Sequence, residues 1–116
     1  MQFTVSLREN RDFRRLYATG KSCVGGCLVV YGKKNRYGQS RLGITVSGKI
    51  GKAVVRNKIR RRLREIYRLH EAEILPGYDV ILVARGRVLS VQYRQLEKEF
   101  LTLCDRLRLT APKELP

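Results

Sequence analysis

The chain has 116 residues, of which 43% are hydrophobic and 30% are charged. This length accommodates one domain whose core needs no disulfide support, and the composition excludes a mainly disordered chain. Lysine and arginine outnumber aspartate and glutamate by 25 to 10, which gives a net charge of +15 at pH 7. Such a charge attracts polyanions and repels copies of the same protein. We therefore expect one domain over residues 1–116, monomeric when free, with nucleic acid as the first candidate partner.

A membrane surface is the second candidate partner. The sequence has no run of 18 apolar residues that would span a bilayer, and no basic-then-apolar amino terminus typical of a secretory signal. An interfacial helix would need a broad apolar face with bulky anchors, whereas the most basic segment has only a narrow aliphatic stripe. We therefore expect a cytoplasmic protein that does not contact membranes.

The first predicted element is a short helix. Residues 1–8 are expected to be a loose extended arm, and Asn10 is the predicted cap of a helix over residues 11–19. Gly20 is predicted to end this helix in a left-handed conformation, which glycine adopts at little cost. The apolar side chains on one face of this helix are Phe13, Leu16 and Tyr17.

Strands are predicted in the next part of the chain. A polar, glycine-containing break follows the first helix, and residues 27–33 then have the composition of a strand. Residues 34–40 carry Asn, Gly, Gln and Ser, which predicts a hairpin connection. Residues 41–47 alternate between aliphatic and small polar side chains. We therefore expect a half-buried antiparallel strand whose second face is unusually small and polar.

A basic helix is predicted over residues 51–68, which read GKAVVRNKIRRRLREIYR. Nine of the 25 lysines and arginines lie between Lys49 and Arg68, and Glu65 is the only acid there. On a helix, the aliphatic side chains of this segment fall on one side and the cationic side chains on the other. A solvated helix face usually mixes charges, because like charges four residues apart repel each other. The cationic side is therefore predicted to bind a polyanion.

The last predicted elements are a buried strand and a helix. Residues 78–84 include four consecutive aliphatic side chains, a pattern typical of a strand buried on both faces. Ser90 is the predicted cap of a final helix in which apolar residues repeat every three or four positions. Residues 110–116 are expected to be loose. This order predicts an α/β (α+β) sandwich, with a mixed four-stranded sheet and the two longer helices on one side.

The sequence offers no self-contained active site. A nuclease needs paired histidines or a carboxylate cluster that holds metal ions, whereas His70 is the only histidine and the ten acids are scattered. His70 is therefore interpreted as a packing or capping residue. The three cysteines, Cys23, Cys27 and Cys104, are interpreted as reduced structural thiols, because a closed zinc site would need His70 as a fourth ligand. We predict no catalytic residue and no metal bound by the protein.

Two groups of residues are suited to nucleic acid. The arginines of the basic helix offer bidentate contacts to phosphates, and Asn57 adds a donor and an acceptor for a sugar hydroxyl or a base edge. Phe13, Tyr17 and Tyr31 are candidates for stacking on unpaired bases, with Arg14 nearby for the backbone. Core packing is the alternative role of these rings, and periodicity alone does not decide between the two.

Two stretches resemble a known family. The stretch VSGKIGKAVVRNKIRRRLREIY, preceded by RLGIT, closely resembles the signature of the bacterial ribonuclease P protein subunit, and NRDFRRLYATGKS resembles the first helix of that family. The resemblance extends from Asn10 to Arg108. Two positions depart from the family pattern: Lys58 stands where an Arg-Asn-Arg triplet usually ends, and Gly48 replaces a basic residue that is common beside Lys49.

The resemblance implies an RNA-based enzyme that removes the 5′ leader from precursor tRNA. In that family the RNA subunit performs the hydrolysis with divalent metal ions such as Mg²⁺, held mainly by RNA, and the protein assists. The implied fold is like the second domain of ribosomal protein S5, with an unusual left-handed crossover through the basic helix. With Arg14 added for its position beside the rings, the predicted leader cleft comprises Phe13, Arg14, Tyr17, Val29 and Tyr31. The residues predicted to face the catalytic RNA are Lys49, Lys52, Arg56, Asn57, Lys58, Arg60, Arg61, Arg64 and Arg68.

Two other functions remain open at this point. A ribosome-associated structural RNA-binding protein would share the fold and the charge but would have no preference for a leader, so it would bind precursor and mature tRNA equally. A DNA-binding regulator would place the basic helix in a major groove and protect duplex DNA of a defined sequence. Such regulators normally show a helix-turn-helix spacing, whereas a strand and a glycine-bearing loop precede the basic helix here.

Overall fold

The computed structural model describes residues 1–110, which form three α-helices, three short 3₁₀ helices and one five-stranded mixed sheet. The α-helices are α1 (Asn10–Thr19), α2 (Ala53–His70) and α3 (Tyr93–Arg106). The strands are β1 (Thr4–Ser6), β2 (Lys21–Val24), β3 (Leu28–Lys34), β4 (Ser40–Thr45) and β5 (Tyr78–Ala84). The 3₁₀ helices are η1 (Gly48–Ile50), η2 (Glu71–Glu73) and η3 (Gly86–Ser90). The predicted α/β class is confirmed, but the predicted four-stranded sheet is wrong because the sheet has five strands.

The strands are arranged in the order β1-β4-β5-β3-β2. The central strand, β5, is parallel to β4 and antiparallel to β3. Since β5 separates β3 from β4, the predicted hairpin connection at residues 34–40 is wrong. The predicted antiparallel direction of β4 is also wrong, because β4 runs parallel to both of its neighbours. An alternating pattern shows which side chains share a face, but it carries no information about the direction of the partner strand.

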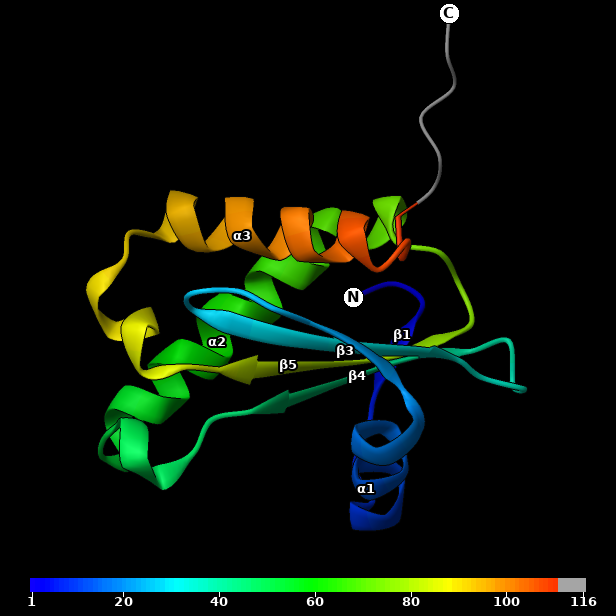
Figure 1. The fold of residues 1–116 in the computed structure, drawn as a ribbon, viewed down its shortest axis with the longest axis horizontal. Coiled ribbons are helices and arrows are strands. Elements are labelled where there is room, and N and C mark those ends of the chain that lie inside the picture. Colours follow the sequence, from blue (N-terminus) through cyan, green and yellow to red (C-terminus); the bar gives the residue numbers. More distant parts are fainter. Residues whose placement is uncertain (111–116) are drawn as a thin grey trace, which may run out of the picture.

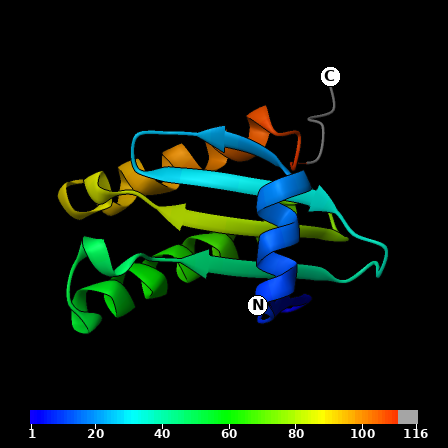
Figure 2. The same ribbon diagram turned by 60° about the horizontal axis from the view of Figure 1, so that its bottom comes forward.

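The α-helices cover both faces of the sheet (Figure 1). Helices α2 and α3 pack on one face, where Leu63 and Phe100 join Val80 and Leu82 of β5 in the main core. Helix α1 lies across the other face, as Figure 2 shows, and Leu16 packs there against Ile81 in a smaller cluster. The prediction that the two longer helices share one side is thus confirmed. No α-helix within residues 1–110 is long and apolar enough to cross a membrane.

Helix α2 has the predicted amphipathic pattern. Its buried side chains, which form a stripe along one side, are Ile59, Leu63, Ile66 and Tyr67. With this stripe on the core and the cationic residues turned outward, α2 connects the parallel neighbours β4 and β5. The left-handed sense of this connection, and the likeness to the second domain of ribosomal protein S5, stay predictions.

The amino-terminal arm is not loose, in contrast to the prediction for residues 1–8. β1 pairs with β4 over three residues, and Leu7 is buried. The backbone N–H of Gln2 also donates to the carboxylate of Glu71, at 2.9 Å. At the other end, Thr110 forms an isolated bridge with Ile74. The rest of the predicted loose tail, residues 111–116, lies outside the described residues.

Three predicted helix boundaries are wrong. Glu9, not Asn10, is the N-cap of α1, because Asn10 already has helical geometry. Gly20 is extended with φ −74°, and its small size matters because a Cβ there would lie 2.6 Å from the carbonyl oxygen of Leu16. Ser90 belongs to η3, and Gln92 is the N-cap of α3.

Candidate nucleic-acid interface

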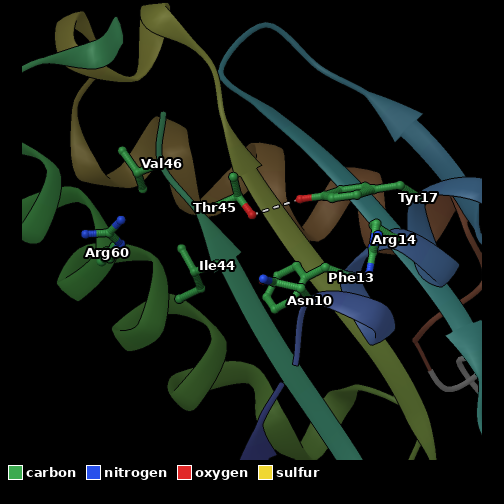
Figure 3. Close-up of a pocket in the computed structure, with 8 residues that line it drawn as sticks. All are labelled: Asn10, Phe13, Arg14, Tyr17, Ile44, Thr45, Val46 and Arg60. Carbon is green, nitrogen blue, oxygen red and sulfur yellow. Dashed lines mark hydrogen bonds between the residues drawn. The ribbon is translucent and has the colours of Figure 1, made fainter. Parts of the chain in front are cut away.

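A groove follows the free edge of β4, between α1 and α2. β1 covers this edge only from Ser40 to Leu42, so the rest of β4 has no strand neighbour on that side. The larger part of the groove is a hollow of about 640 Å³. Its lining from α1 is Asn10, Phe13, Arg14 and Tyr17. The other elements contribute Ile44, Thr45, Val46 and Arg60 (Figure 3).

A second hollow, of about 200 Å³, continues along the same edge and adds Arg64 of α2 and Leu7 to the lining. It shares Phe13, Ile44 and Arg60 with the larger hollow. We call the combined surface the β4 groove. It brings the first helix and the basic helix, which are separate in the sequence, to the two sides of one strand.

Helix α1 is held along β4 through alternate residues on one face of that strand. The ring of Phe13 lies directly on Gly43, where a Cβ would come within 2.7 Å of two ring carbons. One turn further along α1, the hydroxyl of Tyr17 is hydrogen-bonded to that of Thr45, at 2.9 Å (Figure 3). The small polar face predicted for this strand is therefore the surface on which α1 packs.

An ion-pair network holds the start of α1. Arg41, two residues before Gly43 on β4, donates to Asp12 of α1 at 3.3 Å and to both carboxylate oxygens of Asp79 at 2.8 and 2.7 Å. The hydrogen bond with Asp79 raises the pKa of Arg41 further above its ordinary value. The side chains of this network are mostly buried, with 14 to 19% of their surface exposed, so the charges attract each other with little screening by water.

The aromatic rings predicted to form the cleft are brought together in part. The rings of Tyr17 and Tyr31 meet edge to face with centroids 4.9 Å apart, and Phe13 lies 6.3 Å from Tyr17. Tyr17 is 39% exposed, so its ring is available to a ligand as well as to its neighbours. Val29 and Tyr31 share the α1 face of β3 by strand alternation, but neither lines the β4 groove, and Tyr31 meets it only through its contact with Tyr17.

The predicted basic residues are in different environments. Arg60 is half-buried and lines both hollows of the groove, and it donates to the side-chain oxygen of Asn57 at 3.1 Å. The side chain of Arg56 turns back to donate to the carbonyl of Gly51 at 3.1 Å. The remaining predicted cations are exposed on η1, at the N-cap of α2 and on α2 itself; they are Lys49, Lys52, Lys58, Arg61, Arg64 and Arg68.

Within residues 1–110, Arg68 differs from Arg61 and Arg64, the other exposed arginines predicted to bind RNA, because it is paired with an acid. Its guanidinium donates two hydrogen bonds to Glu65, at 3.0 and 2.6 Å. These hydrogen bonds lower the pKa of Glu65, so the acid remains ionised and opposes the charge of Arg68. Arg68 therefore presents less free positive charge to a polyanion than Arg64 does.

Sequence reasoning missed the part of the groove that β4 forms, together with Asn10 as a lining residue. The missed residues are Ile44 and Thr45 of β4 and Val46, which directly follows that strand. The small, polar second face of this strand was a usable signal for Thr45, since small residues allow a helix to lie close. Ile44 and Val46 gave no such signal, because both are aliphatic: Val46 belongs to the main core and Ile44 packs against it. Their place in the groove lining depends on how far β1 extends along β4.

His70 has the predicted packing role. Its two ring nitrogens are hydrogen-bonded to Glu73 and, at 2.8 Å, to Glu97 of α3, so it links the end of α2 to α3. Burial alone would lower the pKa of His70, but the bonds to Glu97 and Glu73 outweigh it and raise the pKa above the ordinary value.

The described residues do not form a metal site. No group of three or more His, Cys, Asp or Glu side chains within residues 1–110 is placed to hold a metal ion. Cys23, Cys27 and Cys104 are free thiols. Burial, together with the charge of Asp105, raises the pKa of Cys104 to about 12, so this thiol stays protonated at neutral pH.

The fold and the groove define a class: a small, very basic α/β protein in which aromatic rings and arginines flank a strand edge. A model of the family described as Ribonuclease P matches residues 1–108. A ribonuclease P protein component from Alkaliphilus oremlandii is 40% identical over 103 residues, 89% of this chain and 90% of that protein.

Solved structures agree with this match. The RNase P protein of Staphylococcus aureus superposes with a TM-score of 0.84 at 34% identity, covering 91% of this chain and 97% of that one. The RNase P protein from Thermotoga maritima gives a TM-score of 0.79 at 36% identity, covering 87% of this chain and 96% of that one. The chain belongs to the family of bacterial ribonuclease P protein components, the protein subunits of a ribonucleoprotein endonuclease of tRNA processing.

Proposed function

We propose that this protein binds the catalytic RNA through the exposed cations of η1 and α2, and the single-stranded 5′ leader of precursor tRNA in the β4 groove. The observation that carries the proposal is the position of Arg60, which lies in one hollow with Phe13 and Tyr17. A single strand of RNA needs rings for its bases and cations for its phosphates, and the groove offers both.

The hydrolysis itself is assigned to the catalytic RNA and its divalent ions. The scattered acids and the single, carboxylate-paired His70 fit a protein that positions RNA better than one that cuts it. The ions, Mg²⁺ among them, are held mainly by RNA in this proposal. Three further statements stay predictions: that Val29 contacts the leader, that the free chain is monomeric, and that the protein is cytoplasmic.

Reconstitution tests the proposal. Catalytic RNA from a bacterial ribonuclease P should cleave precursor tRNA faster with this protein than alone when Mg²⁺ is low, because the protein adds cations that reduce repulsion between the RNA molecules. The same complex should bind precursor tRNA more tightly than mature tRNA. Equal affinity for the two would favour a structural RNA-binding protein and contradict a leader site.

Ring substitutions locate the leader. Phe13→Ala or Tyr31→Ala should weaken binding of precursor tRNA by roughly 1 to 3 kcal/mol and leave mature tRNA unaffected, because each variant removes one stacking surface. Affinities of both tRNAs for the reconstituted complex provide the measurement. An equal loss for both tRNAs would show that the rings serve the core alone.

A further inference from the structure

The free edge of β4 presents backbone hydrogen-bonding groups inside the β4 groove. In a strand, the N–H and C=O groups of alternate residues point to the same edge. The carbonyl of Leu42 points to the β1 edge, because it accepts from the N–H of Leu7 at 2.8 Å. Ile44 has the same orientation, and β1 has already ended at Ser6. One donor and one acceptor of Ile44 therefore face the groove side by side.

The surroundings of this edge favour RNA over another strand of protein. An open strand edge usually attracts a further strand, and proteins protect such edges with charge. Here Arg14 of α1 and Arg60 of α2 line the groove on the two sides of Ile44 (Figure 3). A second copy of this chain, with its net charge of +15, would be repelled. A phosphate-bearing ligand would be attracted.

An unpaired nucleobase has the matching pattern of groups. The Watson–Crick edges of adenine and cytosine carry an amino donor beside a ring-nitrogen acceptor, and those of guanine and uracil carry a ring N–H beside a carbonyl. Proteins recognise single-stranded RNA by stacking its bases and by hydrogen-bonding these edges. In a base-paired region the same groups are occupied, so a strand edge of this kind selects for single strands.

We propose that the main chain of Ile44 binds the Watson–Crick edge of one unpaired base, while the ring of Phe13 provides the adjacent stacking surface. This inference rests on the proposed function, because it takes the leader of precursor tRNA as the strand in the β4 groove. The side chains of Arg14 and Arg60 then contact the neighbouring phosphates. The contact makes Ile44 a specificity-determining residue through its backbone rather than its side chain.

A leader-analogue scan tests the inference without changing the protein. The complex of the full-length protein and the catalytic RNA is given precursor tRNAs in which each leader base is replaced, one at a time, by an apolar isostere. Difluorotoluene is used only where the leader base is a pyrimidine, and the bicyclic 4-methylbenzimidazole is used where it is a purine, so each isostere keeps the stacking surface and removes the hydrogen-bonding edge. One leader position should lose about tenfold in affinity, since two neutral hydrogen bonds are lost. No loss at any leader position would overturn the inference.

A matched pair of variants links the sensitive position to Ile44. Ile44→Pro removes the N–H that faces the groove, and proline is tolerated in edge strands where that N–H is unpaired. The isostere penalty should fall to about twofold in Ile44→Pro and stay near tenfold in Ile44→Val, which keeps the N–H. A folded Ile44→Pro protein that retains the full penalty would contradict the proposal.

Amide hydrogen exchange covers the case in which Ile44→Pro does not fold. In the unmodified protein bound to catalytic RNA, the Ile44 amide should exchange at least tenfold more slowly with precursor tRNA than with mature tRNA. Equal exchange rates would overturn the inference even if precursor tRNA binds more tightly, and the proposed leader site would stand. If the Ile44 amide of the free protein exchanges more slowly as the protein concentration rises, the strand edge pairs with a second copy. That result would also overturn the inference.

Discussion

At the scale of single residues, His70 couples the packing of α2 and α3 to pH. The pKa of His70 is raised in the folded protein, so the imidazole holds its proton more tightly there than in the unfolded chain. Below the unfolded pKa, about 6.5, the full contribution of its pairs with Glu73 and Glu97 is present. As the pH rises through the higher folded pKa, the proton leaves and this contribution is lost.

We therefore expect His70→Gln to lower the free energy of unfolding by about 1 kcal/mol at pH 6 and by less than about half of that at pH 9. The value is modest because Glu73 is 60% exposed, and water screens its charge. Urea unfolding at both pH values measures the difference. Gln95→Ala, an exposed uncharged change on α3, should shift stability equally at both pH values. An equal effect of His70→Gln at both pH values would contradict the assigned charge.

At the scale of elements, the position of α1 depends on the absence of a side chain at Gly43. A Cβ at this position would lie 2.7 Å from Phe13, a distance that real atoms do not tolerate, so the ring and the helix would have to move. Gly43→Ala should therefore lower the free energy of unfolding by about 1 to 3 kcal/mol. Because the displaced ring lines the β4 groove, affinity for precursor tRNA should fall more than affinity for mature tRNA.

Gly86→Ala is the matched control for Gly43→Ala, because a Cβ at Gly86 would meet no atom within 4 Å. This change should alter the free energy of unfolding by no more than about 0.5 kcal/mol. Denaturant unfolding and tRNA affinity in the reconstituted complex report on both variants. If Gly43→Ala behaves like Gly86→Ala, α1 is not held through the contact of Phe13 with β4.

The strands show how far local sequence patterns determine this fold. The continuous aliphatic run of β5 and the alternation of β4 were sufficient to place both strands. β2 was missed because its sequence, KSCV, is mostly polar and exposed at the sheet edge, with only Cys23 half-buried. β1 was missed because three residues are too few for a pattern. The order of the strands in the sheet could not be predicted from local sequence, because β5 lies between β4 and β3, two strands that precede it in the chain.

The candidate site was predictable to a similar extent. The density of arginine and the aliphatic stripe identified the outer face of α2, because both depend only on helix geometry. The rings of α1 were identified as candidates, but periodicity did not distinguish stacking from packing. Tyr17 packs against Tyr31 and is hydrogen-bonded to Thr45 while part of its ring stays exposed, so its stacking on a base stays a prediction. The β4 groove was not predictable, because it exists only where a short β1 leaves β4 uncovered.

At the scale of the whole molecule, the charge of +15 determines how binding depends on salt. If about six phosphates are neutralised by the protein, affinity for RNA should fall roughly a thousandfold between 50 and 200 mM salt, because the release of counterions from the RNA is less favourable at higher salt. Titration of the protein with catalytic RNA at several salt concentrations measures the slope. A slope near zero would mean that the exposed cations of α2 do not contact RNA.

Single arginine variants assign this slope to positions on α2. Arg64→Ala should reduce the slope by about one unit, because its guanidinium is exposed and lines the groove without an acidic partner there. Arg68→Ala should reduce it by less, because Glu65 already balances part of its charge through two hydrogen bonds. Glu65→Gln should then strengthen binding and make the effect of Arg68→Ala equal to that of Arg64→Ala. Identical slopes for both arginine variants with Glu65 present would show that the RNA displaces this ion pair on binding.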